Sequence, residues 1–365
     1  MSASDLGKYG TSIWLDDLSR AKITGTDSHS LPQRIKEASV VGVTTNPSIF
    51  GAAINGAQEY ATDIALLKGS TPEEIVRKLT TDDVRAACDL FTDIYNRTHG
   101  VDGRVSIEVD PRFARNTEAT IEQARELWQR INQPNLLIKV PATKEGLPAI
   151  RTLISEGISV NVTIIFSVSR YVEVLDAFQS GLEARAARGE SLAGIHSVAS
   201  FFVSRVDTEI DARLKQNGHS HLLGRAAIAN AHLAYEAFLE MKRTPQWISL
   251  ALHGAHIQRP LWASTGVKDK SYSDDRYVVE LVAPETVNTM PESTLDAVAD
   301  HGDIRGESIS ASLEQSRADI AALAQLGIDL DEVADKLEQE GLAKFVMPWL
   351  QLINVVEKVA SGDHA

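Results

Sequence analysis

Short apolar segments alternate with amphipathic segments along most of the chain. The apolar segments cover residues 11–16, 39–45, 105–110, 136–140, 158–163, 198–203 and 261–265. Several of them are apolar at nearly every position, as expected for strands that are covered on both faces. The pattern therefore predicts buried strands joined by helices.

The intervening segments carry apolar residues at spacings of three and four, which place them on one face of a helix. The clearest apolar faces are Ile121, Ala124, Leu127, Trp128 and Ile131; Leu147, Ile150, Leu153 and Ile154; and Tyr171, Val174, Leu175 and Phe178. We expect Asn116 to cap the first of these helices, and Gly157 and Gly181 to follow the ends of the other two.

Alternating strands and helices indicate parallel βαβ units, in a closed barrel or an open doubly wound sheet. The eighth strand is ambiguous between residues 277–282 and 286–290, and we favour the second. No Gly-x-Gly-x-x-Gly motif follows the first strand, which weakens the case for a dinucleotide-binding sheet. We predict an α/β fold, a (β/α)8 TIM-type barrel with additional helices. It would form a single domain over residues 1–365, with a helical insertion at about 49–99 and a C-terminal helix at about 335–360.

Charge and composition narrow the classes of function. The formal net charge of −14 argues against binding nucleic acid or an anionic membrane surface. The single cysteine, Cys88, permits neither an intramolecular disulfide nor a thiolate metal cluster, and we expect it to be a small buried residue. The chain lacks a long apolar span and a basic leader followed by an apolar run, so we expect a cytoplasmic protein. Its oligomeric state is left open between monomer and homodimer.

In a (β/α)8 barrel the active site lies at the carboxyl ends of the strands. Polar residues at or just after those ends are Asp16, Asn46, Ser48, Glu108, Lys139, Asn161, Thr163, Ser200, Arg205, Ser264 and Lys268. Because burying a polar group costs free energy, convergence of so many is hard to explain by stability alone.

Lys139 is the most informative of these residues, since four apolar neighbours flank it in a strand buried on both faces. Burial disfavours the charged amine, and a neutral amine is the nucleophile that attacks a ketone to form an imine. The alternative is a lysine that extends to the strand end or pairs with a carboxylate of the barrel.

Glu108 and Asp16 are the matching carboxylates, because imine chemistry needs proton transfer at several steps. Either could instead form a structural ion pair with Lys139. Asp110 precedes a proline and suits a turn, while Asp17 suits the cap of the first helix. The Asn46 amide suits both a turn and the binding of sugar hydroxyls.

His253 and His256 have the spacing of metal ligands on a helix, but no carboxylate cluster accompanies them. We interpret them as part of a surface loop, and we expect neither a metal nor a cofactor.

The motifs resemble those of the transaldolase family over essentially the whole chain. They are SIWLD at 12–16, GVTTNPS at 42–48, VSIEVD at 105–110, LIKVPAT at 137–143, NVT at 161–163, ASFFVSR at 199–205, WAST at 262–265 and TVNTMP at 286–291. The exact sequences of these motifs and the long insertion resemble those of the longer bacterial subfamily, which is not fused to an isomerase. This resemblance implies a barrel enzyme that transfers a dihydroxyacetone unit between sugar phosphates in the non-oxidative pentose phosphate pathway.

The resemblance also implies roles for individual residues. Lys139 would form the Schiff base, Asp16 would assist carbon–carbon bond cleavage, and Glu108 would act through a water that Thr163 helps to hold. The implied substrate-binding residues are Asn46, Ser48, Asn161, Ser200, Phe202, Arg205, Ser264 and Lys268, with Arg205 on the phosphate.

The chain departs from the family pattern after the seventh strand, where many members carry a second phosphate-binding arginine. Lys268 is the best substitute here, together with Ser264, although Lys268 and Lys270 would also suit a solvated loop. A related fructose-6-phosphate aldolase, or a barrel without catalysis, are the alternatives. Related aldolases replace the glutamate with glutamine and carry tyrosine in the region of Phe202, so Glu108 and Phe202 favour the transferase.

Overall fold

The computed structural model describes residues 5–55 and 57–361, and its centre is a closed barrel of eight parallel strands. The strands are β1 (Thr11–Leu15), β2 (Val40–Val43), β3 (Arg104–Glu108), β4 (Leu136–Pro141), β5 (Val160–Ile165), β6 (Ser197–Phe202), β7 (Arg259–Ala263) and β8 (Thr286–Met290). Each strand pairs with the next in sequence, and β1 closes the barrel against β8 over five register pairs. The predicted (β/α)8 fold is confirmed, and the open sheet is excluded.

The eighth strand lies at residues 286–290, as the sequence favoured. The competing segment instead contributes the short helix α14 (Arg276–Val279). In β4, β5 and β6 every residue is buried, as expected for strands that are covered on both faces.

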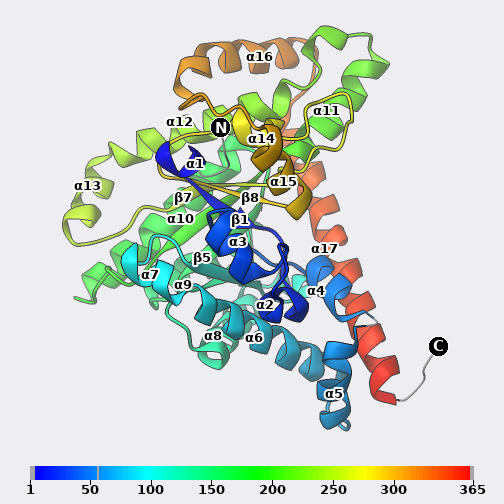
Figure 1. The fold of residues 1–365 in the computed structure, drawn as a ribbon. Coiled ribbons are helices and arrows are strands. Elements are labelled where there is room, and N and C mark those ends of the chain that lie inside the picture. The colour runs from blue at the N-terminus through cyan, green and yellow to red at the C-terminus, as the bar shows by residue number, and fades with distance from the viewer. Residues whose placement is uncertain (1–4, 56, 362–365) are drawn as a thin grey trace.

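Helices surround the barrel, as Figure 1 shows. Before β3 these are α1 (Asp5–Lys8), α2 (Arg20–Thr24), α3 (Leu31–Glu37), α4 (Pro47–Ile54), α5 (Gln58–Leu66), α6 (Pro72–Leu90) and α7 (Thr92–Arg97). After β3 they are α8 (Thr117–Ile131), α9 (Gly146–Ser155), α10 (Val168–Ala187), α11 (Ser204–Gln216), α12 (Ala226–Lys242), α13 (Pro245–Leu252), α15 (Glu292–His301), α16 (Leu313–Gln325) and α17 (Leu330–Ser361), with 3-10 turns η1 (Pro111–Phe113), η2 (Ser220–Leu222) and η3 (Ser310–Ser312).

The segment predicted to hold extra helices contains α4 to α7. Of these, α6 packs against β3 and α8, so it takes the place of the barrel helix between β2 and β3. Cys88 lies buried in α6, as expected.

The helix ends predicted from the sequence agree with the structure at Asn116 and Gly157 and differ from it at Gly181. Asn116 caps α8 as predicted, because its side chain accepts a hydrogen bond from the Ala119 backbone at 3.0 Å. Gly157 follows α9 as predicted, but α10 continues through Gly181. A Cβ at Gly181 would lie 2.7 Å from the Arg151 carbonyl oxygen, so this glycine lets α9 and α10 approach closely.

The C-terminal helix α17 has 32 residues and begins a few residues before the predicted start. It runs along one side of the barrel in Figure 1, shown in red. It contacts α4, α5 and α6 as well as α11 and β5. This path carries Phe345 and Trp349 toward the carboxyl ends of the strands.

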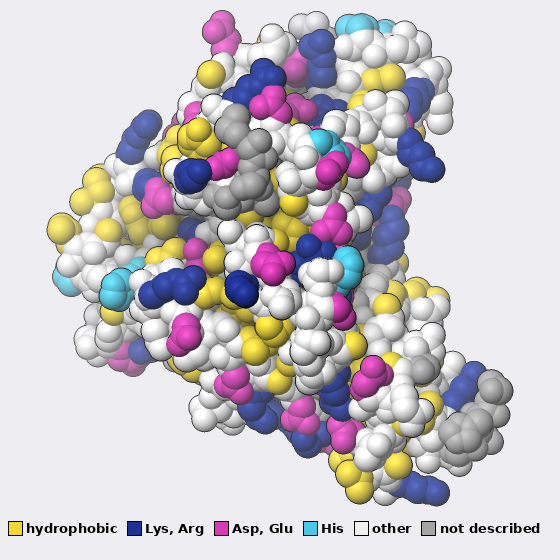
Figure 2. Space-filling view, viewed as in Figure 1, with side chains coloured by type: hydrophobic (Ala, Val, Ile, Leu, Met, Phe, Trp, Pro, Cys, Tyr) yellow, Lys and Arg dark blue, Asp and Glu magenta, His cyan; other side chains and the backbone are white. Residues whose placement is uncertain are grey.

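The face shown in Figure 2 carries Lys and Arg side chains interspersed with Asp and Glu. No helix among the described residues has the length and apolar character needed to cross a membrane.

Candidate active site

A cavity of about 160 Å³ opens at the carboxyl ends of the strands. Its lining contains eight of the predicted site residues, namely Asp16, Asn46, Lys139, Ser200, Phe202, Arg205, Ser264 and Lys268, together with Thr44, Ala263, Gly266, Thr289, Pro291 and Phe345. Residues from six strands or the loops that follow them therefore meet at one mouth of the barrel.

Lys139 lies within β4 and is only 4% exposed. Its amine donates a hydrogen bond to the Thr45 carbonyl oxygen at 3.1 Å and lies 3.4 Å from a carboxylate oxygen of Glu108. The Phe345 ring from α17 lies on another side, with its centroid 5.5 Å from the amine. The amine is thus held in an enclosed space beside one acidic group.

Glu108 is the register partner of Lys139 on β3. Neither of its carboxylate oxygens accepts a hydrogen bond from the described residues. Burial raises the pKa of Glu108, and the neighbouring Lys139 amine opposes that rise. A carboxyl group that is buried and lacks fixed donors is suited to exchanging a proton.

A second, smaller cavity of about 20 Å³ lies next to Glu108, with Asn46 and Trp349 also in its lining. This volume accommodates one water molecule. The Trp349 indole nitrogen is buried without a hydrogen-bond partner in residues 5–55 and 57–361.

Asn161 and Ser200 form a fixed polar row beside Lys139. The Asn161 amide donates to the Ser106 hydroxyl at 3.0 Å, and the Ser200 hydroxyl donates to the Asn161 amide oxygen at 2.7 Å. Since Asn161 is the register partner of Lys139 on β5, this row sets the orientation of the amide.

Thr163 lies two residues further along β5 and outside the lining of the main cavity. It is fully buried, and its hydroxyl has no partner among the described residues. The next residue, Ile164, has a φ of 57°, and the pairing of β5 with β6 shifts register between Val162 and Ile165. A β-branched residue at positive φ is strained, so the strand end carrying Thr163 has an irregular backbone.

Asp16 accepts a hydrogen bond from Thr44, which in turn contacts Thr289, and the sequence did not indicate a role for either threonine. The Thr44 hydroxyl donates to an Asp16 oxygen at 2.7 Å and lies 2.6 Å from the Thr289 hydroxyl. Because one hydroxyl has a single proton, Thr289 must be the donor in the second bond. Their position could have indicated this role, since both threonines lie near strand ends, within the GVTTNPS and TVNTMP motifs.

Arg205 lies at the start of α11, with its guanidinium 5.4 Å from the centre of the Phe202 ring. One terminal nitrogen of Arg205 is buried without a hydrogen-bond partner in the described structure. Burial lowers the pKa of Arg205, which the negative charges of Asp16 and Glu340 partly offset. This arginine therefore has donor capacity left for an anion.

The loop after β7 supplies the other residues that line the cavity near Arg205. Ser264 has a φ of 55° and its hydroxyl lies 3.1 Å from the Ser204 hydroxyl. Lys268 is exposed at the rim.

Some predicted residues lie elsewhere or have other contacts. Ser48 is exposed on α4 and lies outside the cavity lining, because Asn46 is the cap and the helix turns the next residues away. The Asn46 side chain accepts a hydrogen bond from the Ile49 backbone at 3.1 Å while also lining the cavity. Asp17 does not cap the first helix after β1, as Ser19 does so. Asp110 shapes a turn as expected, by capping η1 and pairing with Arg112.

His253 and His256 do not form a ligand pair. The His253 ring bonds the Ser249 carbonyl oxygen, while the His256 ring stacks on His196 with centroids 4.1 Å apart. Among the described residues, one group with the donors and proximity for a metal is Asp274, Asp275 and His301, which lies outside the cavity lining.

Comparison with known proteins decides the family. The family model for transaldolase/fructose-6-phosphate aldolase matches residues 13–356. The chain belongs to this family. It is 56% identical over 365 residues to Transaldolase 1 of Streptomyces avermitilis, covering 99% of this chain and 96% of the relative. It is 53% identical over 354 residues to the transaldolase of Mycobacterium tuberculosis, covering 95% and 94% of the two chains. It is also 53% identical over 356 residues to the transaldolase of Saccharopolyspora erythraea, covering 97% and 96%.

The matched region contains every cavity residue named above, from Asp16 to Trp349. Transaldolase-family membership implies sugar-phosphate substrates, which agrees with a polar cavity that presents a lysine amine, a carboxylate and an unpaired guanidinium nitrogen.

Proposed function

We propose that this protein is a transaldolase, which uses Lys139 to carry a dihydroxyacetone unit from one sugar phosphate to another. The overall reaction converts sedoheptulose 7-phosphate and glyceraldehyde 3-phosphate to erythrose 4-phosphate and fructose 6-phosphate. The observation that carries this proposal is the buried Lys139 amine, 3.4 Å from Glu108 and in one cavity with Asp16.

Imine formation is the first step. The Lys139 amine attacks the C2 carbonyl of the donor ketose, and loss of water gives the imine. Two features support this step. The amine is enclosed, and the neighbouring Glu108 carboxyl group can exchange the protons of the water-loss step. The carbonyl oxygen of Thr45 holds the amine in place.

Carbon–carbon cleavage follows. The imine withdraws electrons as the C3–C4 bond breaks, and Asp16 accepts the proton of the C4 hydroxyl. The aldehyde product leaves, and the three-carbon carbanion stays bound as an enamine. Hydrogen bonding from Thr44 orients the Asp16 carboxylate for this transfer.

Transfer reverses these steps with a second aldehyde. Asp16 returns its proton to the new hydroxyl, and water then hydrolyses the imine to release the product. We assign Glu108 as the acid and base of the water steps, with Thr163 helping to hold the water. The one-water cavity beside Glu108 supports the role of Glu108, whereas Thr163 lies outside the lining of that cavity.

Substrate binding is assigned to polar residues beside Lys139. Asn46 and Ser200 line the cavity, while Asn161 lies outside its lining as the register partner of Lys139 on β5. Their amide and hydroxyl groups would bind hydroxyls of the dihydroxyacetone unit. Arg205 would bind the phosphate with Ser264 and Lys268, because an arginine fork matches phosphate oxygens and a lysine adds a point charge.

Phe202 favours transfer over simple aldol cleavage. Its ring packs edge-on against Phe166 at 5.1 Å and below Arg205, and it presents no hydroxyl to the cavity. A carbanion beside this wall lacks a proton donor there, so it persists until an aldehyde arrives.

The test is incubation with fructose 6-phosphate, with and without erythrose 4-phosphate. We expect rapid formation of sedoheptulose 7-phosphate when both are present, and little free dihydroxyacetone beyond one turnover without the acceptor. Sustained dihydroxyacetone release without acceptor, at the rate of transfer, would show that the protein is an aldolase. Activity in a strong chelator is expected to be unchanged.

We further propose that the enzyme works in the cytoplasm on free sugar phosphates, as a monomer or homodimer. Its acidic net charge of −14 supports a role away from nucleic acid and anionic membrane surfaces.

A further inference from the structure

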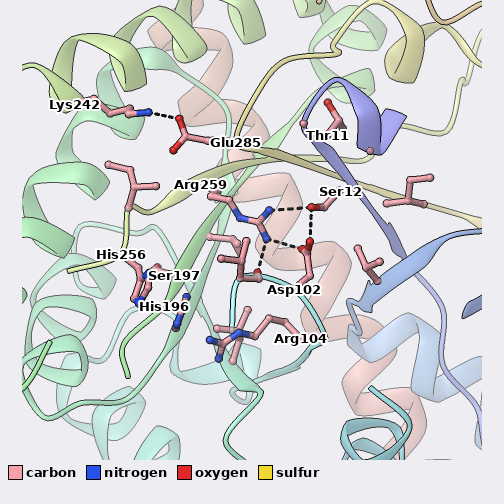
Figure 3. Close-up of a pocket in the computed structure, with 18 of the residues that line it drawn as sticks. Thr11, Ser12, Asp102, Arg104, His196, Ser197, Lys242, His256, Arg259 and Glu285 are labelled. Atoms are coloured by element: carbon pink, nitrogen blue, oxygen red, sulfur yellow. Dashed lines mark hydrogen bonds and ion pairs between the residues drawn. The ribbon is translucent and has the colours of Figure 1, made fainter. Parts of the chain in front are cut away.

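A larger cavity, of about 740 Å³, lies at the opposite end of the barrel from the candidate active site. Its lining includes the first residue of four strands, namely Thr11, Arg104, Ser197 and Arg259. Figure 3 shows how these side chains lie around it. The volume is in the range that holds small-molecule ligands.

Most of the charged side chains here have a partner of opposite charge. Arg259 pairs with Asp102 at 2.9 Å and also donates to the Ser12 hydroxyl at 2.9 Å. Lys242 pairs with Glu285. Both pairs are drawn in Figure 3, and together they leave no net charge.

Arg104 is the exception. Its side chain is almost completely buried, at 1% exposure, and no carboxylate in the described structure lies within ion-pair distance. Two of its nitrogens donate to backbone carbonyl oxygens, to Gly100 at 2.7 Å and to Pro134 at 3.2 Å. The third nitrogen, Nη2, is buried and has no hydrogen-bond partner within residues 5–55 and 57–361. A buried guanidinium with an unused donor is costly unless an acceptor completes it, and an anionic acceptor would also balance its charge.

The electrostatics of Arg104 agree with a missing anion. Burial lowers the pKa of Arg104 to about 10, and repulsion from the positive charge of Arg259 also lowers it. Burial and the two arginines also lower the pKa of His196, to about 2, so its imidazole stays neutral. Arg104 Nη2 and His196 Nε2 both lie beside Gly100, since a Cβ there would be 2.9 Å and 2.8 Å from them.

The remaining walls are apolar. Val41, Val198, Trp247 and Ile257 line the cavity, beside the stacked rings of His196 and His256. These surfaces suit the carbon skeleton of a ligand, whereas the arginine suits an oxyanion.

We propose that this cavity at the amino ends of the strands, the lower cavity, binds a small organic anion. Its phosphate or carboxylate group would lie on Arg104, and its apolar part against Trp247 and the stacked rings of His196 and His256. The site is separate from the proposed transaldolase site, because Arg104 and Glu108 are the first and last residues of β3.

Isothermal titration calorimetry on the full chain tests this proposal, with phenyl phosphate and benzoate as probes and benzyl alcohol as the neutral control. A tighter Kd for phenyl phosphate would identify the anion as a phosphate ester, and a tighter Kd for benzoate would identify a carboxylate. Arg104→Met should weaken binding of the tighter probe by roughly tenfold or more, as expected for loss of a charge-assisted hydrogen bond. The variant Arg205→Met removes the arginine proposed to bind phosphate at the other end of the barrel, so the binding that remains in this variant is assigned to the lower cavity.

Ala255→Trp provides an independent variant if Arg104→Met does not fold. Ala255 lines the lower cavity, so a tryptophan there should fill it and weaken binding without removing a charge. The proposal is overturned if neither anion binds, if benzyl alcohol binds equally well, or if binding is lost in Arg205→Met but kept in Ala255→Trp.

Discussion

The amine of Lys139 lies 3.4 Å from a carboxylate oxygen of Glu108, and the two residues are register partners on adjacent strands. Both side chains are almost completely buried. The ordered sheet therefore fixes their separation, and a proton lost by one is within reach of the other. This is the arrangement that imine formation and hydrolysis require.

Replacing Lys139 with methionine should abolish transfer. Loss of the only proposed nucleophile should lower kcat by at least about 10³-fold. Borohydride reduction with fructose 6-phosphate should add a dihydroxyacetone-derived mass to the Lys139 peptide of the wild-type protein, as read by mass spectrometry. Lys144→Met, at an exposed position nearby, is the matched control and should retain activity. A label on another peptide, or equal labelling of the Lys139→Met protein, would refute the assignment.

The pH dependence should report on Glu108. Since burial raises the pKa of Glu108, its basic form is lost as pH falls through a value above the ordinary 4.5. The acid limb of kcat/KM should therefore lie at higher pH than for a free glutamate. Glu108→Gln should remove this limb and lower kcat by roughly 10²- to 10⁴-fold. Asp110→Asn, which removes a carboxylate next to the same strand end, should keep the limb. An unchanged limb in Glu108→Gln would assign it to another group.

Phosphate recognition should depend on Arg205. Arg205→Ala should raise KM for fructose 6-phosphate by roughly 10- to 100-fold, because a charge-assisted contact is lost. The KM for unphosphorylated fructose should change far less. Lys268→Ala should have a smaller effect, since this side chain is exposed to solvent. Equal effects of Arg205→Ala on both sugars would remove the phosphate role.

The fate of the carbanion should depend on Glu108 and Phe202. The double variant Glu108→Gln with Phe202→Tyr places a hydroxyl on the cavity wall, and it should raise the ratio of free dihydroxyacetone to transfer product. Product analysis with and without erythrose 4-phosphate measures this ratio, and Phe166→Tyr serves as the control for an added hydroxyl on the neighbouring ring. An unchanged ratio would mean that these positions do not control the fate of the intermediate.

Gly42 should be necessary for barrel packing. Its register partner is Trp14, and a Cβ at Gly42 would lie 2.6 Å from the Trp14 ring. Gly42→Ala should therefore lower the free energy of unfolding by about 1–3 kcal/mol through overpacking. Urea unfolding measures this loss, as a lower midpoint concentration with an unchanged dependence of the unfolding free energy on urea. Gly51→Ala, where a Cβ meets nothing within 4 Å, is the control and should not destabilise.

The barrel was predictable because its signals are local. Strands buried on both faces are apolar throughout, and the helices between them have apolar faces at regular spacing. Lys139 was conspicuous for the same reason, as a charge inside such a strand. Gly181 was misinterpreted because its role depends on α9, which packs across it.

Features that depend on distant contacts were not predictable. Ser48 belongs to a specific motif, but the turn that Asn46 caps directs it to solvent. Phe345 lies on the C-terminal helix, far from the strands in sequence, and only the path of α17 brings its ring beside Lys139. Arg104 was not predicted as a site residue because it begins β3, whereas a barrel active site is expected at the carboxyl ends of the strands.

The position of Phe345 ties the active site to the order of protein synthesis. Lys139 is made first, and one wall of its cavity comes from α17, which follows it in the chain and leaves the ribosome later. A nascent chain that has formed all eight strands still exposes its reactive amine on that side. The amine is therefore shielded from solvent on that side only after α17 has packed against the barrel.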